Sequence, residues 1–333
     1  MAVRLIEAFM PADRLELARS SLSSLDTLSI WWEKLSNDQA QLHILAEAER
    51  SEEITDKLRS ALADSGDALK IVSLPVEASI PAPEETPEEE RKSAAVLTRK
   101  FHRVSREELR ADVQEMMRTS WPNFIMTILS AVVAAVGLAR SNIAIIIGAM
   151  VIAPLLGPNV GLALSVTLGD FGFILRALRE NLLRIGAALA FAFMMGSLFK
   201  IDSSVAEIAS RTVIDQTDIV VALAAGAAGA LALSTGAPAT LIGVMVAAAL
   251  MPPLVVTGML TALGEYKCAL GSLQLLGVNL ISINLAGILT FLAVGVRPGS
   301  QEDVTRARVL VTLALMVWIA LLVALAFLIL SGA

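Results

Sequence analysis

The feature of this chain that most constrains its fold is a segment that occurs twice. Residues 144–171, AIIIGAMVIAPLLGPNVGLALSVTLGDF, align without a gap with residues 239–266, ATLIGVMVAAALMPPLVVTGMLTALGEY, after a shift of 95 positions. Eleven of the first 26 aligned pairs are identical, and they include glycine, methionine and proline positions that an apolar composition alone does not explain. We therefore interpret the two segments as copies of an internal repeat.

Each copy carries prolines near the middle of a long apolar segment, Pro154 and Pro158 in the first and Pro252 and Pro253 in the second. A helix of about 27 residues would be about 40 Å long, which exceeds the roughly 30 Å hydrocarbon core of a bilayer. Proline also lacks an N–H group and leaves carbonyls without a helical partner, which lipid tolerates only inside protein or beside water. Broken helices in corresponding repeats indicate the substrate site of a transporter. The simpler alternative is that the prolines only kink two packed helices.

Charge and hydropathy divide the chain into a soluble front and a membrane-embedded back. The mean hydropathy is +0.70. Residues 1–122 hold 16 Lys and Arg and 23 Asp and Glu, whereas residues 123–333 hold only 10 and 9. The acidic front argues against nucleic acid as a partner, because phosphate binding requires clustered basic residues. One cysteine and two histidines exclude a disulfide framework and a Cys/His zinc cluster.

The front of the chain has the pattern of a small α+β domain. Strand-like runs at 3–9, 27–33, 40–46 and 69–77 alternate with helical segments at 12–25 and 51–63. The order β-α-β-β-α-β predicts a ferredoxin-like cytoplasmic domain over residues 1–77. We expect one of Trp31 and Trp32 to fill its core and His43 to lie at or near its surface. The chain starts directly with a strand-like run, so we expect no cleavable signal peptide.

Two segments connect this domain to the membrane. Residues 78–92 are acidic and rich in proline, which is typical of a solvated linker. Residues 93–120 are basic and contain a capping-box start, Ser105 to Glu108, for an amphipathic helix. We expect this helix to lie on the anionic cytoplasmic surface of the bilayer.

Residues 121–333 predict an α-helical transmembrane domain of about seven helices. The first repeat, 122–200, and the second, 218–295, would each supply three, and 309–331 would be an extra helix. Three spans is an odd number, so the copies would be inserted in opposite orientations as a 3+3 inverted repeat. With the N-terminus in the cytoplasm, inside loops at 169–184 and 296–308 are basic and the outside loop at 200–217 is acidic. We therefore expect a multi-pass protein of a prokaryotic inner membrane.

With these motifs in hand, the chain resembles the family catalogued as domain of unknown function 389. The resemblance rests on GAMVIAPLLGPNVGLALSVTLGDF and its second copy, and on the strings RLIEAFMPADR, SREELRADVQEM and GVNLISINLAGI. It implies a prokaryotic integral membrane protein with a small N-terminal domain and no established activity. It supplies no catalytic or binding residues.

No enzymatic motif is present, so we expect no catalytic residues, no metal site and no cofactor. The acids nearest the spans, Asp170, Glu180 and Glu265, are expected at helix ends, which weakens the case for a carboxylate relay. Asn side chains and freed carbonyls could hold a cation, and free N–H groups at the start of a half-helix could hold an anion. Interhelical hydrogen bonding is the simpler role of the Asn residues. The predicted substrate or ion site comprises Gly148, Pro154, Pro158, Asn159, Gly243, Pro252, Pro253, Asn279 and Asn284.

The sequence thus predicts a secondary transporter or channel-like protein, regulated by its N-terminal domain, that moves a small solute or ion. The expected partners are the lipid bilayer, that substrate, and further copies of the chain in a homo-oligomer. The competing hypothesis is a non-transporting membrane sensor or scaffold, whose soluble domain binds a ligand or partner.

Overall fold

The computed structural model describes residues 3–76 and 104–331, apart from positions 24, 26, 36–37, 48–49, 200–201, 204, 238 and 299–300. The chain divides into two compact units, Met1–Glu108 and Leu109–Ala333. The predicted linker at 78–92 and the basic residues before position 104 lie outside the described residues.

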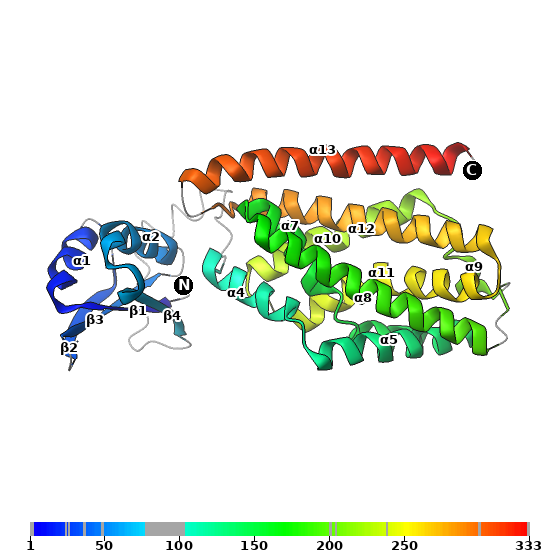
Figure 1. Cartoon of the computed structure of the whole chain (residues 1–333), viewed down its shortest axis with the longest axis horizontal. Helices are drawn as coiled ribbons and strands as arrows, with labels where there is room; N and C mark the ends of the chain where they lie inside the picture. The colour runs from blue at the N-terminus through cyan, green and yellow to red at the C-terminus, as the bar shows by residue number, and fades with distance from the viewer. Residues whose placement is uncertain are drawn as a thin grey trace, which may run out of the picture. The chain divides into compact units, whose positions relative to one another are not determined.

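The described residues of the first unit form one antiparallel sheet of four strands in the order β2-β3-β1-β4 (Figure 1). β1 pairs with β3 on one side and β4 on the other, and β2 pairs only with β3. Its elements are β1 (Val3–Pro11), η1 (Ala12–Arg14), α1 (Leu15–Leu22), β2 (Ser29–Leu35), β3 (Gln39–Glu47), α2 (Ser51–Ala61), η3 (Ala63–Ala68) and β4 (Lys70–Val76).

The core of this unit lies between the sheet and its two α-helices. Alternate residues of β1 and β3, such as Ile6 and Ile44, are fully buried together with Leu22 of α1 and Leu58 of α2. This alternation follows from the two-residue period of a strand, which turns every second side chain to the same face.

The expectation that one tryptophan fills the core is wrong. Trp31 and Trp32 are each 43% exposed, because they lie on the edge strand β2. Trp32 lies under the guanidinium of Arg19 at 3.6 Å, and Trp31 stacks on the ring of His43 at 5.1 Å. His43 is itself buried, at 9% exposure, so the expectation that it lies at or near the surface is also wrong.

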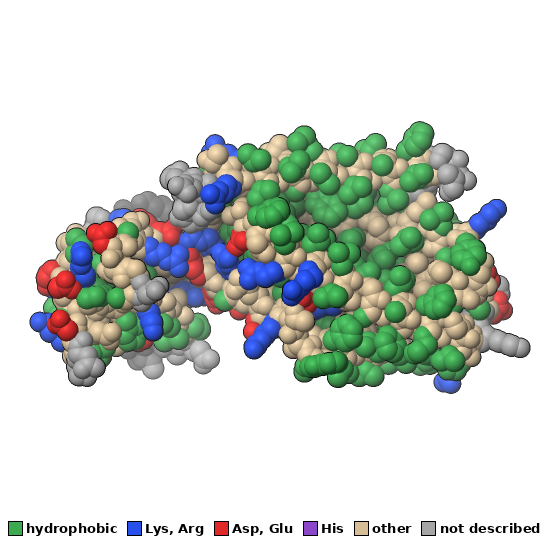
Figure 2. Space-filling view, viewed as in Figure 1, with side chains coloured by type: hydrophobic (Ala, Val, Ile, Leu, Met, Phe, Trp, Pro, Cys, Tyr) green, Lys and Arg blue, Asp and Glu red, His purple; other side chains and the backbone are tan. Residues whose placement is uncertain are grey.

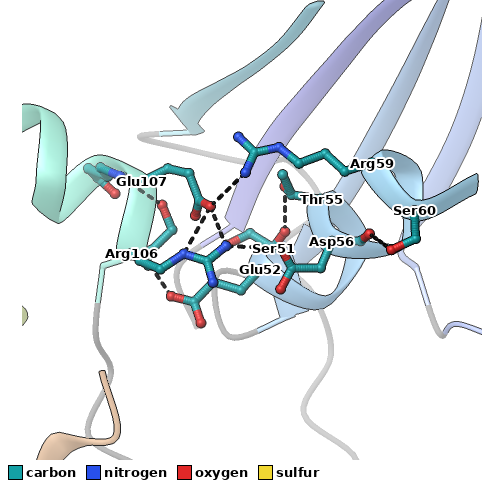
Figure 3. A network of polar contacts seen from close by, with 10 residues as sticks. Ser51, Glu52, Thr55, Asp56, Arg59, Ser60, Arg106 and Glu107 are labelled. Atoms are coloured by element: carbon teal, nitrogen blue, oxygen red, sulfur yellow. Dashed lines mark hydrogen bonds and ion pairs between the residues drawn. The ribbon is translucent and has the colours of Figure 1, made fainter. Parts of the chain in front are cut away.

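The start of α4 (Arg106–Met117) is held by charged residues of the first unit (Figure 3). The backbone N–H of Arg106 donates to Glu52 at 2.6 Å, and that of Glu108 donates to the Ser105 hydroxyl at 3.2 Å, as the capping-box motif predicts. The Arg106 side chain pairs with Asp56 at 2.9 Å and with Glu107. Burial alone lowers the pKa of Arg106, but its bonds to Glu107 and Asp56 outweigh it and raise the pKa above its ordinary value.

The second unit is a bundle of helices (Figure 1). Within the described residues, six helices are long and apolar enough to cross a membrane, or seven if the bent pair α6–α7 counts as one span. Apolar side chains cover much of the visible flank of this unit (Figure 2). The helices after α4 are α5 (Trp121–Ala139), α6 (Ile143–Ile152), α7 (Leu156–Leu168), α8 (Phe171–Leu198), α9 (Ala206–Ala209), α10 (Gln216–Ser234), α11 (Ala239–Ala262), α12 (Tyr266–Val294) and α13 (Gln301–Ser331).

Three helices form the interior of this bundle. All 13 residues of α7 are buried, and α11 and α12 are the most buried of the long apolar helices. By contrast, the most apolar 18-residue stretch of α13 contains no buried residue. This part of the helix therefore lies on the outside of the bundle. In a membrane protein the surroundings of the bundle are lipid, with which exposed Leu, Val and Phe side chains are compatible.

Two predictions about the helices are wrong. α8 begins at Phe171, so Arg176, Arg179 and Arg184 lie on a helix and not in a loop at 169–184. The second copy is not broken, because α11 continues through Pro252 and Pro253. Only the first copy is interrupted, between Ile152 and Leu156, where α6 and α7 meet at a bend of 53°.

Replacing Leu58 by Ala should destabilise the first unit by about 2–5 kcal/mol, because the change leaves a cavity in a closed core. Hydrogen exchange of the β1 and β3 amides in the purified full-length chain measures this loss. Leu17→Ala on α1 is the matched control, because Leu17 is 43% exposed. Equal exchange rates in the two variants would contradict the assigned core.

Candidate functional site

The break between α6 and α7 leaves a backbone carbonyl that needs an external partner. Pro158 has no N–H group to donate to the Pro154 carbonyl four residues earlier. The guanidinium of Arg184 on α8 donates to this carbonyl through Nη1. Arg184 is only 3% exposed, so its charge is placed inside the bundle, where it replaces the missing helical bond.

The prolines of α11 create the same problem, and another side chain solves it. Pro253 has no N–H group for the carbonyl of Ala249, and Nδ2 of Asn279 on α12 donates to that carbonyl at 2.7 Å. The carbonyl of Pro253 itself accepts bonds from Ser272 at 2.8 Å and Thr257 at 2.7 Å. The bond from Asn279 thus replaces the helical bond that Pro253 cannot make.

The two carbonyls and their donors occupy matching positions of the sequence repeat. The shift of 95 positions aligns Pro154 with Ala249, Pro158 with Pro253, and Arg184 with Asn279. In both copies the donor therefore follows the carbonyl by 30 residues. Asn279 is among the site residues predicted from the sequence, whereas Arg184 is not, although the same shift of 95 positions leads from one to the other.

Arg184 also belongs to a buried ionic network. Its Nη2 lies 3.9 Å from Glu180 and 3.4 Å from the carbonyl of Met116 at the end of α4. Glu180 is 4% exposed and also binds Thr119 and Arg179. The expectation that Glu180 lies at a helix end is therefore wrong, because α8 extends nine residues before it.

The later part of α4 packs closely against α7, the second half of the broken span. A Cβ atom on Gly157 would lie 2.7 Å from the carbonyl oxygen of Met116, and one on Gly161 would overlap the sulfur of Met117. Val113 and Met117 of α4 are buried in this contact. The expectation that α4 lies on the bilayer surface is wrong for this face, because its apolar residues pack against protein.

Asn159 and Asn284 link α7 to α12 in the bundle interior. Both residues are fully buried, and Nδ2 of Asn284 lies 3.5 Å from Oδ1 of Asn159, which is a long contact. Their stronger bonds go to backbone carbonyls, from Asn159 to Leu155 at 2.8 Å and from Asn284 to Leu280 at 2.9 Å. The Oδ1 atoms of Asn279 and Asn284 and the Ser282 hydroxyl have no hydrogen-bond partner among the described residues.

The structure does not bring every predicted residue to these contacts. Gly148 is exposed on α6 and Gly243 is half-buried on α11, and a Cβ atom on either would have no neighbour within 4 Å. Pro252 is buried beside Pro253. Among the described residues, no group of three or more His, Cys, Asp or Glu side chains is arranged to hold a metal ion.

These helices define a multi-pass membrane protein whose buried polar residues gather around two proline segments. A family model described as "Domain of unknown function (DUF389)" matches residues 150–285, which include both proline segments and Asn159, Asn279 and Asn284. An uncharacterised protein of Methanocaldococcus jannaschii is 31% identical over 325 residues, covering 97% of this chain and 98% of that protein. The chain belongs to the DUF389 family. No solved structure matches it.

Replacing Arg184 by Met should cost about 3–5 kcal/mol of stability, because the change removes one of the two arginines paired with the buried Glu180 carboxylate and leaves the Pro154 carbonyl without its donor. Asn279→Leu should cost less, about 1–3 kcal/mol, because it only removes the donor to one carbonyl. The free energy of unfolding in detergent measures both losses. Ser197→Ala is the control, because its hydroxyl donates only to its own helix at Phe193. Adding Glu180→Gln to Arg184→Met should recover part of the loss, and no recovery would contradict the ionic network.

Gly161→Leu should displace α4 from α7, because the new side chain overlaps Met117 and Val113. Trypsin cleavage after Arg118, beyond the end of α4, should then become about tenfold faster, since proteolysis follows the population of the open form. Gly148→Leu introduces the same side chain into open space and should leave the rate unchanged. Equal rates in both variants would show that the close approach of α4 is not required to hold it.

Proposed function

We propose that this protein is a secondary transporter or channel-like protein that moves a small solute or ion between α7, α11 and α12. The observation that carries the proposal is the matched pair of proline-freed carbonyls, each satisfied by a side chain from the next long helix. A hydrogen bond from a side chain of one helix to a carbonyl of another can break when the two helices move apart. A backbone hydrogen bond within one helix is not broken by such a movement. Transporters use discontinuous helices in this way to form a site near the bilayer midplane.

An inverted repeat is supported by the helix boundaries. The shift of 95 positions superposes the limits of α5, Trp121–Ala139, on those of α10, Gln216–Ser234. It also brings the start of α8 onto that of α12. If α6 and α7 form one span, each copy has three spans, and an odd number places the copies in opposite orientations.

The orientation with a cytoplasmic N-terminus is supported by the charges at the two ends of the bundle. Arg110 of α4 pairs with Asp170 at the start of α8, and Gly169 is adjacent to Ala307 of α13, so these segments share one end. That end carries most of the arginines, whereas the segment 202–218 carries acids. The positive-inside rule then makes the arginine-rich end cytoplasmic, consistent with a prokaryotic inner membrane.

The first unit is the proposed regulator. Its β-α-β-β-α-β order with strands arranged β2-β3-β1-β4 supports a ferredoxin-like fold. Its acidic residues hold the first turn of α4, and α4 continues into the second unit, where Met116 shares Arg184 with the broken span. We also propose that several copies of the chain assemble into a homo-oligomer.

The alternative is a membrane sensor or scaffold without transport, in which the repeat only anchors the chain. The complete burial of α7 and its close contact with α4 favour this alternative, because a packed interior leaves a solute no path. The two hypotheses differ in whether water reaches the interior Asn residues in any state.

Cysteine accessibility in native membranes separates the two hypotheses. Single cysteines at Asn159, Pro252 and Asn284, in a Cys268→Ala background, should react with a water-soluble thiol reagent if a solvated pathway passes these positions. Position 157 stays glycine, because a side chain there would overlap Met116. The native chain, whose Cys268 is exposed, is labelled in parallel as the reactive control. Full protection of all three cysteines, with Cys268 labelled, would contradict transport and favour the scaffold.

A further inference from the structure

The hydrogen bonds of the interior Asn residues fix which way their amides point. Nδ2 of Asn159, Asn279 and Asn284 donates to a backbone carbonyl in each case, at 2.8, 2.7 and 2.9 Å. A carbonyl has no hydrogen to give, so turning any of these amides over would place oxygen against oxygen. In each of these amides the oxygen is therefore the atom turned away from that carbonyl.

The oxygens of Asn159 and Asn284 are poorly satisfied although both residues are fully buried. Within the described part of the chain, Oδ1 of Asn284 has no partner, and Oδ1 of Asn159 has only the 3.5 Å contact with an N–H₂ group already bonded to Leu280. An unpaired polar group in a buried site costs free energy comparable to a lost hydrogen bond. This pair of oxygens therefore has unused capacity to accept a positive charge or a hydrogen.

Most other buried side-chain donors that the structure describes on α7, α8 and α11 are already engaged. On α7 and α11 the buried hydroxyls of Ser165, Thr167 and Thr257 donate to carbonyls of their own helices. Arg184 donates to the carbonyls of Pro154 and Met116 and pairs with Glu180. Ser282 can accept as readily as it can donate. The unpartnered atoms of the Asn residues are amide oxygens, which can only accept, so these side chains favour a cation over an anion.

The same environment favours a monovalent over a divalent cation. Ca²⁺ and Mg²⁺ sites rely on carboxylates, and transition metals on imidazole or thiolate. In the described part of the bundle, the buried carboxylate of Glu180 is neutralised by Arg184. Neutral amide and carbonyl oxygens suit an alkali-metal or ammonium-type ion, whose smaller charge needs less compensation.

The sequence repeat supplies this polar pair only once. The shift of 95 positions places Leu254 opposite Asn159 and Leu189 opposite Asn284. The equivalent contact of α8 and α11 is therefore apolar, and the Asn pair marks a single position between the two copies. We propose that this position binds the transported substrate, a monovalent cation held by the amide oxygens of Asn159 and Asn284. This inference rests on the transport function proposed above.

Thermal unfolding of the purified full-length chain tests cation binding without requiring transport. Sodium, potassium and ammonium chlorides are compared with choline chloride at equal ionic strength, because choline is too large for a site between two packed helices. At least one small cation should raise the unfolding temperature of the native chain and of Asn284→Asp, since a ligand that binds only the folded state stabilises it. Asn284→Leu should lose the effect. Thr167→Val, which removes a hydroxyl bonded only within its own helix, should keep it.

Tracer flux into proteoliposomes then separates the cation inference from the transport hypothesis. Sodium or rubidium flux should fall at least about tenfold in Asn284→Leu, which is equivalent to about 1.4 kcal/mol or more. The flux should persist in Asn284→Asp. Chloride flux that both Asn284 variants abolish would overturn the cation inference and leave transport standing. No difference between small cations and choline in the unfolding experiment would overturn the inference whatever the flux. Cation stabilisation without flux or cysteine labelling would reject transport, and with it the identification of the ion as a substrate.

Discussion

A backbone carbonyl that has lost its helical partner cannot remain unpaired inside a membrane protein, and the arrangement of the bundle depends on how two such carbonyls are satisfied. Pro158 and Pro253 each remove one N–H group at matching positions of the repeat. Arg184 on α8 and Asn279 on α12 supply the missing donors, each 30 residues after the carbonyl to which it donates. This requirement fixes the register of α8 against the α6–α7 break and of α12 against α11.

The two donors solve the same problem with different consequences. The amide of Asn279 is neutral, and α11 remains one helix through its prolines. Arg184 brings a charge into the interior, which requires Glu180 as a counter-ion and accepts the end of α4 as a further partner. The break in the first copy is therefore tied to α4, whose close approach depends on Gly157 and Gly161. The two copies differ at this position, because the first carries the charged Arg184 where the second carries the neutral Asn279.

Much of this could be predicted from residue patterns. The duplicated segment, the capping-box start at Ser105 and the alternation of apolar residues in β1 and β3 are local signals, and the structure places a helix or strand at each. The prediction for Trp31 and Trp32 was wrong because a two-residue period shows that they face opposite sides but not that their strand lies at the sheet edge. The loop expected at 169–184 was wrong because its arginines resemble a solvated segment, whereas Arg184 has partners elsewhere in the chain.

The sequence by itself determined that the chain has a charged α+β front and a duplicated apolar back, because composition and periodicity are properties of neighbouring residues. It also determined where backbone hydrogen bonds must be missing, since proline removes its N–H wherever it stands. Only the tertiary structure decided which side chains replace those bonds, and that Asn159 meets Asn284 from 125 residues away. The packing of the helices determines these partners. A local sequence pattern does not show which distant residue will lie beside a given side chain after packing.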